Sequence, residues 1–480
     1  MNNLEIIIGI ENHVELKTKS KMFSKSAAEF NVAPNTSVDE RVFGLPGALP
    51  SVNKKGVELA LLACNGLNME IDTLLRFDRK NYFYPDLAKG FQITQNFFPI
   101  GKNGYLEIEV NGKNKKIDIE RLHIEEDTAK QIHKDDKTYL DYNRSGVGLV
   151  EIVTRPVLRG ADEAVAYLEK LRETLLYLGI SDVKMNEGSL RCDINISLRP
   201  YGVDKFGSKV EIKNLNSFNN VKKAIDFEIK RQTEMILNNE IISQETRRFD
   251  EKTQETILMR SKGDALDYKY FAEPNIFPIQ LDKNWVNNVI KNSPELPSVK
   301  RNKYLNKFGL NKKEIDYILA DYDFNNIFES LVQNTKTEPK KVFNLLSSDI
   351  QSILNLKGIS FKESNFNVEN ISKILNLLNE EKISSKHVKV ILQILSEKKD
   401  TVENIIDKNN LKLISDEKSI INILEPIILK NTELIKNEFN NRPERVLKTI
   451  MGSLMKETQG NVSPSIAQKI IDIKIKEIVK

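Results

Sequence analysis

The chain has 480 residues, of which 40% are hydrophobic and 29% charged, and its net charge of +4 is slight. This balance predicts a soluble protein of about two to four domains and neither requires nor excludes a nucleic-acid partner. Two cysteines, Cys64 and Cys192, exclude a disulfide framework and a four-cysteine zinc site. No apolar run approaches ~20 residues and no basic segment precedes the first apolar run, so we expect a cytoplasmic protein without a membrane span or signal peptide.

The first predicted strand is residues 8–17, IGIENHVELK, which alternate with a period of two. One face of this strand carries Ile8, Ile10, Asn12, Val14 and Leu16. The other face carries Gly9, Glu11, His13, Glu15 and Lys17. The first face is typical of a core, and the second is either a solvated surface or a site.

Three later segments repeat this pattern. Residues 106–127 read as a hairpin that turns at Asn111-Gly112, with Arg121, His123 and Glu125 on one face of its second strand. Residues 189–200 alternate between a core face and a polar face that carries Arg191, Asp193, Asn195 and Arg199. Residues 209–214 place Lys209, Glu211 and Lys213 on the polar face.

A helix is predicted over 160–179, with Asp162 as its N-cap and Gly179 as its stop. The composition changes further along the chain. Only four of the 21 glycines follow Gly263, and the residues after 292–301 show helical spacing. We therefore expect an α+β domain over 1–290, a helical domain over 291–410 and a helical tail over 411–480.

The polar strand faces leave two interpretations open. Amphipathic strands with wet outer faces are common. However, two carboxylates 4 Å apart repel by roughly 4 kcal/mol at an effective dielectric near 20, so converging acids would need a cation or basic partners. Glu151 inside the apolar run 147–153 is costly unless it is paired or bound to metal. Arg79, Lys80 and Asn81 in FDRKNYFYPD are either phosphate contacts or a strand end.

Several runs also resemble the GatB family, the B subunits of the aspartyl/glutamyl-tRNA amidotransferase, along nearly the whole chain. The matching runs, in order, are GIENHVELKTKSKMF, GLPGALPSVNK, FDRKNYFYPDL, DYNRSGVGLVEIV, VKMNEGSLRCDINIS, KNLNSF, QETRRFDE and MRSKGDALDYKYFAEP. The resemblance implies an N-terminal domain related in fold to glutamine synthetase and guanidino kinases, with a mixed, largely antiparallel sheet. It also implies an all-α C-terminal region that binds tRNA.

The activity that the resemblance implies is that of a ligase that forms a carbon–nitrogen bond with glutamine as amido donor. Such enzymes phosphorylate the side chain of Glu on tRNA(Gln), or of Asp on tRNA(Asn), with ATP, and ammonia then displaces phosphate. A separate amidase subunit would supply the ammonia, and a small third subunit would hold the two together. No phosphate-binding P-loop and no nucleophile constellation is seen in the sequence, which agrees with this division of labour.

With this resemblance, we assign candidate residues on the polar faces. Mg²⁺ is expected at Glu11, His13, Glu125, Glu151 and Asp193, although Glu126 competes with Glu125. Lys80, Arg144 and Arg191 are expected to be catalytic. ATP is expected to contact Lys80, Asn81, Arg144, Arg191, Lys213 and Arg247.

The segments FSKSAAEF and TSVDERVFGL lack the four cysteines that many family members carry there, so no zinc is expected. Two alternatives remain. A tRNA-recruiting scaffold with a dead metal site would belong to the same complex. A generic Mg²⁺-dependent ATPase does not account for the tRNA-module resemblance.

Overall fold

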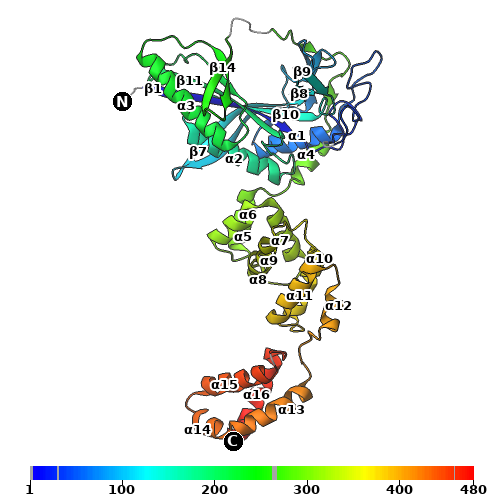
Figure 1. Cartoon of the computed structure of the whole chain (residues 1–480), viewed down its shortest axis with the longest axis vertical. Coiled ribbons are helices and arrows are strands. Elements are labelled where there is room, and N and C mark those ends of the chain that lie inside the picture. Colours follow the sequence, from blue (N-terminus) through cyan, green and yellow to red (C-terminus); the bar gives the residue numbers. More distant parts are fainter. Residues whose placement is uncertain (1–3, 30–31, 262–266, 459, 480) are drawn as a thin grey trace. The chain divides into compact units, whose positions relative to one another are not determined.

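The computed structural model describes residues 4–29, 32–261, 267–458 and 460–479. The chain divides into two compact units, Met1–Val299 and Lys300–Lys480, which are drawn in Figure 1. Residues 262–266 of the last matching run lie outside the described residues, as does Phe30 of FSKSAAEF. The three-domain division at 290 and 410 stays a prediction.

A nine-stranded sheet forms the centre of the first unit. Its strands, in spatial order, are β14 (Glu255–Ser261), β13 (Glu245–Asp250), β12 (Val210–Lys213), β11 (Leu190–Pro200), β1 (Leu4–Glu15), β10 (Gly148–Thr154), β7 (Lys113–Glu126), β6 (Gly101–Val110) and β2 (Glu70–Ile71). Neighbouring strands are antiparallel except β12 and β13, which are parallel. The predicted mixed, largely antiparallel sheet is therefore confirmed.

The alternation along the strands sets the two faces of this sheet. Ile8, Ile10, Val14, Ile194 and Ile196 are buried in the core, as predicted. The predicted turn between β6 and β7 is also confirmed, because Asn111 and Gly112 both have positive φ angles, 53° and 73°.

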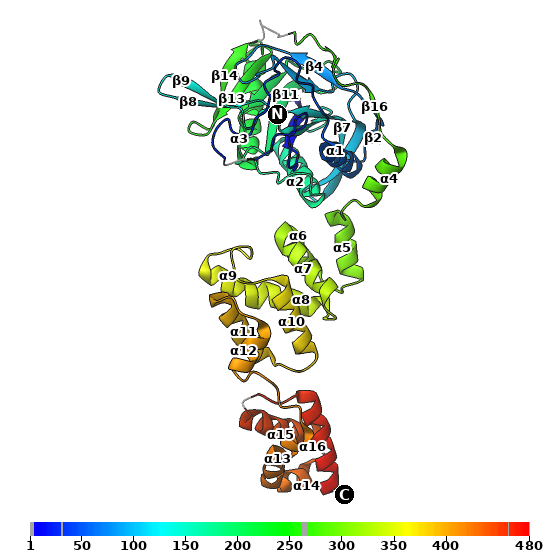
Figure 2. The ribbon, with the colours of Figure 1, turned by 90° about the vertical axis from the view of Figure 1, so that its right-hand side faces the viewer.

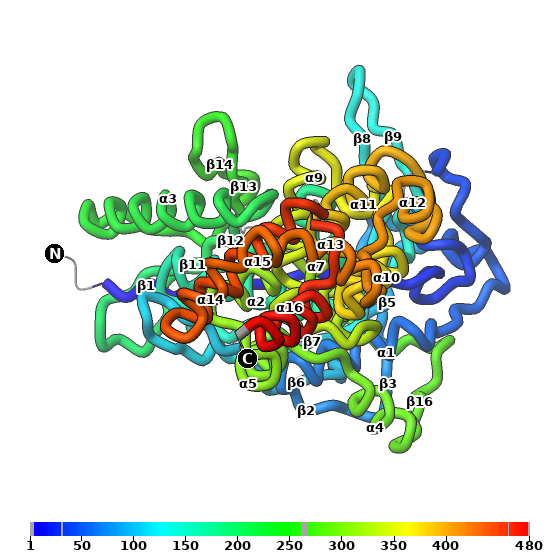
Figure 3. The backbone as a smooth tube through the Cα atoms, turned by 90° about the horizontal axis from the view of Figure 1, so that it is seen from below, coloured from blue at the N-terminus to red at the C-terminus, as the bar shows by residue number. Residues whose placement is uncertain are grey.

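Helices cover the apolar face. They are α1 (Lys54–Gly66), α2 (Ala161–Tyr177) and α3 (Phe218–Leu237), and Figure 3 shows α3 running beside β13 and β14. A fourth helix, α4 (Lys283–Lys291), packs against α1. The predicted N-cap at Asp162 is wrong: the cap is Gly160, two residues earlier, and Asp162 pairs instead with Lys222 at 2.6 Å.

Three small sheets complete this unit. They are β15 (Phe271–Ala272) with β4 (Asp78–Asn81) and β5 (Phe91–Thr94), β16 (Ile279–Gln280) with β3 (Leu74–Leu75), and the hairpin of β8 (Lys130–Lys134) and β9 (Lys137–Asp141). Figures 2 and 3 show the hairpin projecting from the unit. Strand β5 lies against the end of β7, because Gln92 donates to the Glu126 carbonyl at 2.6 Å and the Ile93 N–H to Glu126 Oε1 at 3.0 Å.

The rest of the chain is helical, as predicted. Its helices are α5 (Pro297–Asn306), α6 (Lys312–Ala320), α7 (Tyr322–Asn334), α8 (Pro339–Asn344), the π-helix η1 (Leu345–Ile350), α9 (Gln351–Lys357), α10 (Val368–Asn379), α11 (Ser385–Glu397), α12 (Val402–Lys408), α13 (Glu417–Lys430), α14 (Thr432–Glu438), α15 (Pro443–Glu457) and α16 (Pro464–Val479). Helices α13–α16 share an apolar core of their own. Among the described residues, none of the helices has the length and apolarity needed to cross a membrane.

Candidate active site

The strand register aligns four polar residues in one row across the large sheet. Arg191 pairs with His13, His13 with Glu151, and Glu151 with His123, on strands β11, β1, β10 and β7. Residues directly opposite each other in a sheet point to the same face. The polar side chains of four strands, separate in the sequence, therefore gather in one place.

Two of these side chains, His13 and Glu151, form a tight cluster with Glu125 of β7. His13 Nε2 lies 3.5 Å from Glu125 Oε1 and 3.5 Å from Glu151 Oε2. One donor atom from each of His13, Glu125 and Glu151 lies within 4.8 Å of the other two. Two carboxylates and an imidazole at this spacing are a donor set that suits a divalent cation with oxygen preference.

His123 lies directly beside this cluster. Its Nε2 is 3.2 Å from Glu151 Oε2 and 3.7 Å from Glu125 Oε2. Burial opposes the charged imidazole, but the Glu151 carboxylate outweighs it and raises the pKa of His123 to about 9. In turn, Glu151 is buried, which disfavours its charge, yet the adjacent His123 holds the pKa of this carboxyl well below its usual range. His13 is also buried, which disfavours its charge, but its hydrogen bond with Glu151 and the nearby Glu125 raise its pKa.

Basic residues surround the cluster. Lys80 is mostly buried, which disfavours its charge, but Glu125 and other acidic groups nearby, including Glu151, raise its pKa. Arg191 Nη2 donates to Asp127 Oδ2 at 2.7 Å, and Arg144 Nε lies 3.5 Å from the same oxygen. The site thus combines a cation-binding donor set with the basic residues Lys80 and Arg191, and Asp127 links Arg191 to Arg144, an arrangement suited to phosphate.

Two family models match the chain. The model described as "GatB/GatE catalytic domain" matches residues 6–287, and the one described as "GatB domain" matches residues 326–475. The chain is 60% identical, over the whole of both chains, to the B subunit of the aspartyl/glutamyl-tRNA(Asn/Gln) amidotransferase of Mycoplasma mycoides. Proteins of the same name from Mesoplasma florum and Staphylococcus aureus are 58% and 43% identical to it, each over 98% of both chains.

The chain belongs to the GatB family. Membership confirms the predicted resemblance and, with it, the enzyme class, a subunit of an amidotransferase. Because the relatives are named as one subunit of that enzyme, GatB proteins work in a multi-subunit enzyme. The match of residues 6–287 to a catalytic domain favours the catalytic role over the scaffold.

In this GatB chain the structure brings together three of the predicted metal ligands, His13, Glu125 and Glu151. Glu11 and Asp193 face each other one row away. Glu11 accepts a hydrogen bond from Asn195 at 2.8 Å, and Asp193 pairs with Lys213. Their assignment as ligands stays a prediction.

The competition between the two glutamates of β7 has a structural answer. Glu126 is 3% exposed and forms a buried ion pair with Lys89, and it accepts from the Ile93 N–H. Glu125 lies in the cluster with His13. Alternation along β7 separates the two side chains, and the geometry favours Glu125.

The predicted nucleotide contacts divide by location. Lys80 and Arg191 lie near the cluster, and Arg144 is linked to Arg191 through Asp127. Lys213 lies one row away, in ion pairs with Asp193 and Glu211. Asn81 instead holds a neighbouring segment, because its Nδ2 donates to the Lys269 carbonyl at 2.8 Å. Its predicted contact with ATP stays a prediction.

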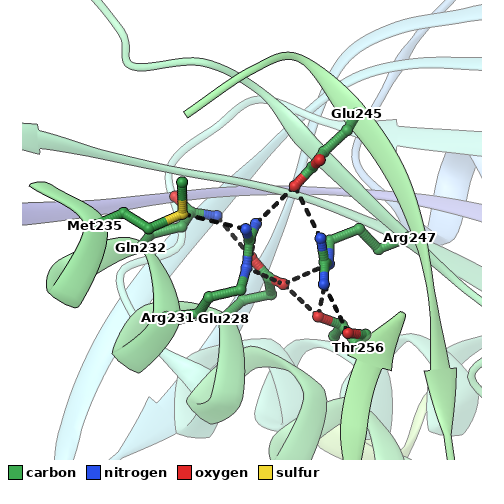
Figure 4. A network of polar contacts seen from close by, with 7 residues as sticks. All are labelled: Glu228, Arg231, Gln232, Met235, Glu245, Arg247 and Thr256. Atoms are coloured by element: carbon green, nitrogen blue, oxygen red, sulfur yellow. Dashed lines mark hydrogen bonds and ion pairs between the residues drawn. The ribbon is translucent and has the colours of Figure 1, made fainter. Parts of the chain in front are cut away.

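The structure does not bring Arg247 to this site. Figure 4 shows its guanidinium in a network between α3 and β14. Arg247 donates to the Thr256 hydroxyl at 2.8 Å and to Glu245 Oε1 at 3.1 Å, and it lies 3.2 Å from the fully buried Glu228. This network explains the position of Arg247 without a nucleotide.

Sequence reasoning missed two residues of the site, His123 and Asp127. The face shared by His123 and Glu125 was visible in the alternation of β7 and could have identified the histidine. Asp127 follows the end of β7, where alternation gives no information. Only its contacts with Arg144 and Arg191 reveal that it fixes two basic side chains.

Proposed function

We propose that this chain phosphorylates the side-chain carboxylate of Glu on tRNA(Gln), of Asp on tRNA(Asn), or of both, and then converts the product to the amide. The single observation that carries the proposal is the cluster of His13, Glu125 and Glu151, with Lys80 and Arg191 nearby and Arg144 linked to Arg191 through Asp127. A phosphoryl-transfer site needs a cation and positive clamps more than it needs a protein nucleophile.

The chemistry proceeds in two displacements. In the first, an oxygen of the substrate carboxylate attacks the γ-phosphorus of ATP, the bond to the β–γ bridging oxygen breaks, and ADP leaves. In the second, ammonia attacks the carbonyl carbon of the acyl phosphate, inorganic phosphate leaves, and the nitrogen loses a proton. Phosphorylation is required because a free carboxylate is a poor electrophile.

The residues of the chain have distinct parts in this proposal. His13, Glu125 and Glu151 would hold Mg²⁺, which when bound supplies positive charge beside the phosphate oxygens. Lys80 is placed to contact the transferred phosphoryl group, since it already interacts with the Glu125 and Glu151 carboxylates. Asp127 holds Arg144 and Arg191 in place, so these guanidiniums contact phosphate without a large loss of side-chain entropy.

We further propose that ammonia comes from an amidase subunit of the complex, that a small third subunit joins them, and that the enzyme works in the cytoplasm.

The helices after residue 410 are proposed to bind tRNA. Helices α13–α16 share an apolar core of their own, so the proposed role can be tested by removing them as a unit. Deletion of residues after 410 should weaken tRNA binding at equal salt and leave the ATP site intact.

The decisive experiment uses the complex with the amidase nucleophile disabled, an ammonium salt, and ATP radiolabelled on its γ-phosphate. Label should reach the aminoacyl group before amide appears, with Glu-tRNA(Gln) and Asp-tRNA(Asn) tested separately. Lys80→Ala should slow this transfer about a hundredfold, whereas Lys130→Ala on the exposed β8 strand should not. Amide formation at full rate without ATP would favour the scaffold alternative.

A further inference from the structure

In the small sheet β15–β4–β5, Arg79 and Asn81 of β4 donate hydrogen bonds to a neighbouring segment, and Lys80 lies between them. Arg79 donates to both carboxylate oxygens of Glu273, at 2.5 and 3.1 Å, and its guanidinium stacks on Phe91 at 3.8 Å. The Asn81 backbone N–H donates to the Tyr268 carbonyl at 2.9 Å, and its side chain to the Lys269 carbonyl. Arg79 and Asn81 therefore hold residues 268–273 at two points, and the residue between them, Lys80, points to the other face of β4.

Lys80 is bordered by aromatic rings on this other face. Its ammonium lies 4.7 Å from the centre of the Tyr268 ring and 5.9 Å from that of Tyr82. The rings of Tyr82 and Tyr268 are 5.8 Å apart, and those of Tyr268 and Tyr270 are 6.0 Å apart. We call Tyr82, Tyr268 and Tyr270 the tyrosine wall.

The tyrosine wall and the metal cluster meet at Lys80. Two rings of the wall lie 4.7 and 5.9 Å from the Lys80 ammonium, and the nearby carboxylates of the cluster, Glu125 first, raise the pKa of Lys80 against the opposing effect of burial. A nucleotide whose phosphate or ester end contacts Lys80 would therefore have its base within reach of the rings.

The wall is also open to a ligand. Its three tyrosines are only half-buried, and the neighbouring Phe83 and Phe271 are 99% and 46% exposed. An aromatic cluster that served only as a core would be covered by other side chains, as Phe249 and Tyr167 are. The hold that Arg79 and Asn81 keep on the 268–273 segment fixes its rings in advance, which lowers the entropic cost of binding.

We propose that the tyrosine wall seats an adenine ring by stacking, with Lys80 at the phosphate or ester end of the same nucleotide. This inference rests on the proposed function, in which two adenine rings must come near the cluster: that of ATP and that of the 3′-terminal adenosine of the aminoacyl-tRNA. Stacking on aromatic side chains is how proteins commonly hold an unpaired base.

The test uses the full complex and paired probes, of which one carries an adenosine and the other lacks it. AMP-PNP is compared with tripolyphosphate, both with Mg²⁺, and deacylated tRNA ending in CCA is compared with the same tRNA ending in CC. In the pair whose adenine stacks on the tyrosine wall, Tyr268→Ala should lower the affinity for the adenine-containing probe about tenfold. The affinity for the probe without adenine should not change. Tyr268→Phe should bind as the wild type does. Tyr139→Ala, a 49% exposed tyrosine of β9, is the matched control.

The outcomes separate the two sources of adenine. A loss confined to AMP-PNP assigns the wall to ATP, and a loss confined to the CCA end assigns it to tRNA. Unchanged affinities in both pairs for Tyr268→Ala and for a second variant, Tyr82→Ala, would overturn the proposal. Equal weakening of AMP-PNP and tripolyphosphate would also overturn it, since the tyrosines would then act only by placing Lys80. Failure of the proposed function would appear separately, as absence of label transfer in the wild type.

Discussion

His13 and Glu151 face each other across the antiparallel strands β1 and β10, with Nε2 of the histidine 3.5 Å from Oε2 of the glutamate. Both residues lie in strands whose other face is apolar and packs into the core. The pairing register places their side chains on the opposite face, next to Glu125 of β7. A histidine between two carboxylates in this way is expected to contribute to cation binding.

The first prediction concerns His13. His13→Ala removes the imidazole and leaves only two carboxylates to bind a cation. Changes at a metal site typically lower the metal affinity at least tenfold, so we expect Mn²⁺ binding to weaken by about tenfold or more. Label transfer from ATP should be lost, while glutamine hydrolysis by the amidase subunit should persist. Electron paramagnetic resonance of Mn²⁺ measures the binding. The control is His133→Ala, an exposed histidine of β8. Unchanged Mn²⁺ affinity in His13→Ala would remove this histidine from the site.

The second prediction separates Arg247 from its neighbour Arg248. Arg247→Gln removes one of the two guanidiniums beside Glu228, which is 0% exposed and keeps its pair with Arg231. The free energy of unfolding should therefore fall by about 2 kcal/mol, without a change in the KM for ATP. Arg248 points the other way, and its side chain is 45% exposed and 3.6 Å from Asp250. Arg248→Gln should therefore change the free energy of unfolding by less than about 0.5 kcal/mol.

Chemical denaturation and steady-state kinetics of the two variants test this prediction together. A raised KM for ATP in Arg247→Gln, with unchanged stability, would return Arg247 to the set of nucleotide contacts.

The third prediction concerns Asn12, which lies on the core face of β1 with 0% exposure. Neither its Oδ1 nor its Nδ2 has a hydrogen-bond partner among the described residues. Burial of an amide without partners is unfavourable, so Asn12→Val should raise the free energy of unfolding by about 1 kcal/mol or more and leave amidation unchanged. Asn12→Ala is the control for size, since it leaves a cavity and should gain less. Loss of stability in Asn12→Val would show that the amide is satisfied in solution.

The fourth prediction is a pH dependence in the helical unit. Glu329 of α7 is partly buried, which disfavours its charge, but its hydrogen bond with Lys300 lowers the pKa of the carboxyl below its ordinary value of 4.5. Because the folded pKa is the lower one, this carboxylate contributes its full stability above pH 4.5 and loses it as the pH falls through the folded pKa.

Hydrogen exchange of peptides from α7 between about pH 7 and pH 3 measures this effect locally. In Glu329→Gln, the protection of α7 amides against exchange at pH 7 should fall by an amount equivalent to about 3 kcal/mol. The loss of this protection on acidification should also become smaller. Glu369→Gln, which removes a 79% exposed carboxylate 3.4 Å from Lys373, is the control and should change little. Equal acid dependence in wild type and Glu329→Gln would contradict the assignment.

Local sequence patterns were enough to show which face of each strand is polar. Side chains of an extended strand alternate strictly, so His13, Glu151 and Arg191 could be separated from the core residues beside them without coordinates. The Asn111-Gly112 turn was equally local, because two positive φ angles favour these residue types. The family could also be recognised from sequence, since the matching runs are long and in order.

The tertiary structure alone decided which strands are neighbours and which charges meet. Alternation could not choose between Arg247 and Arg248, since either face of β13 could have pointed to the site, and packing against α3 placed Arg247 beside Glu228. Likewise, Asp193 is on the predicted face, yet the adjacent strand β12 brings Lys213 to it. Strand order and register depend on contacts between residues far apart in the chain, and no local pattern encodes them.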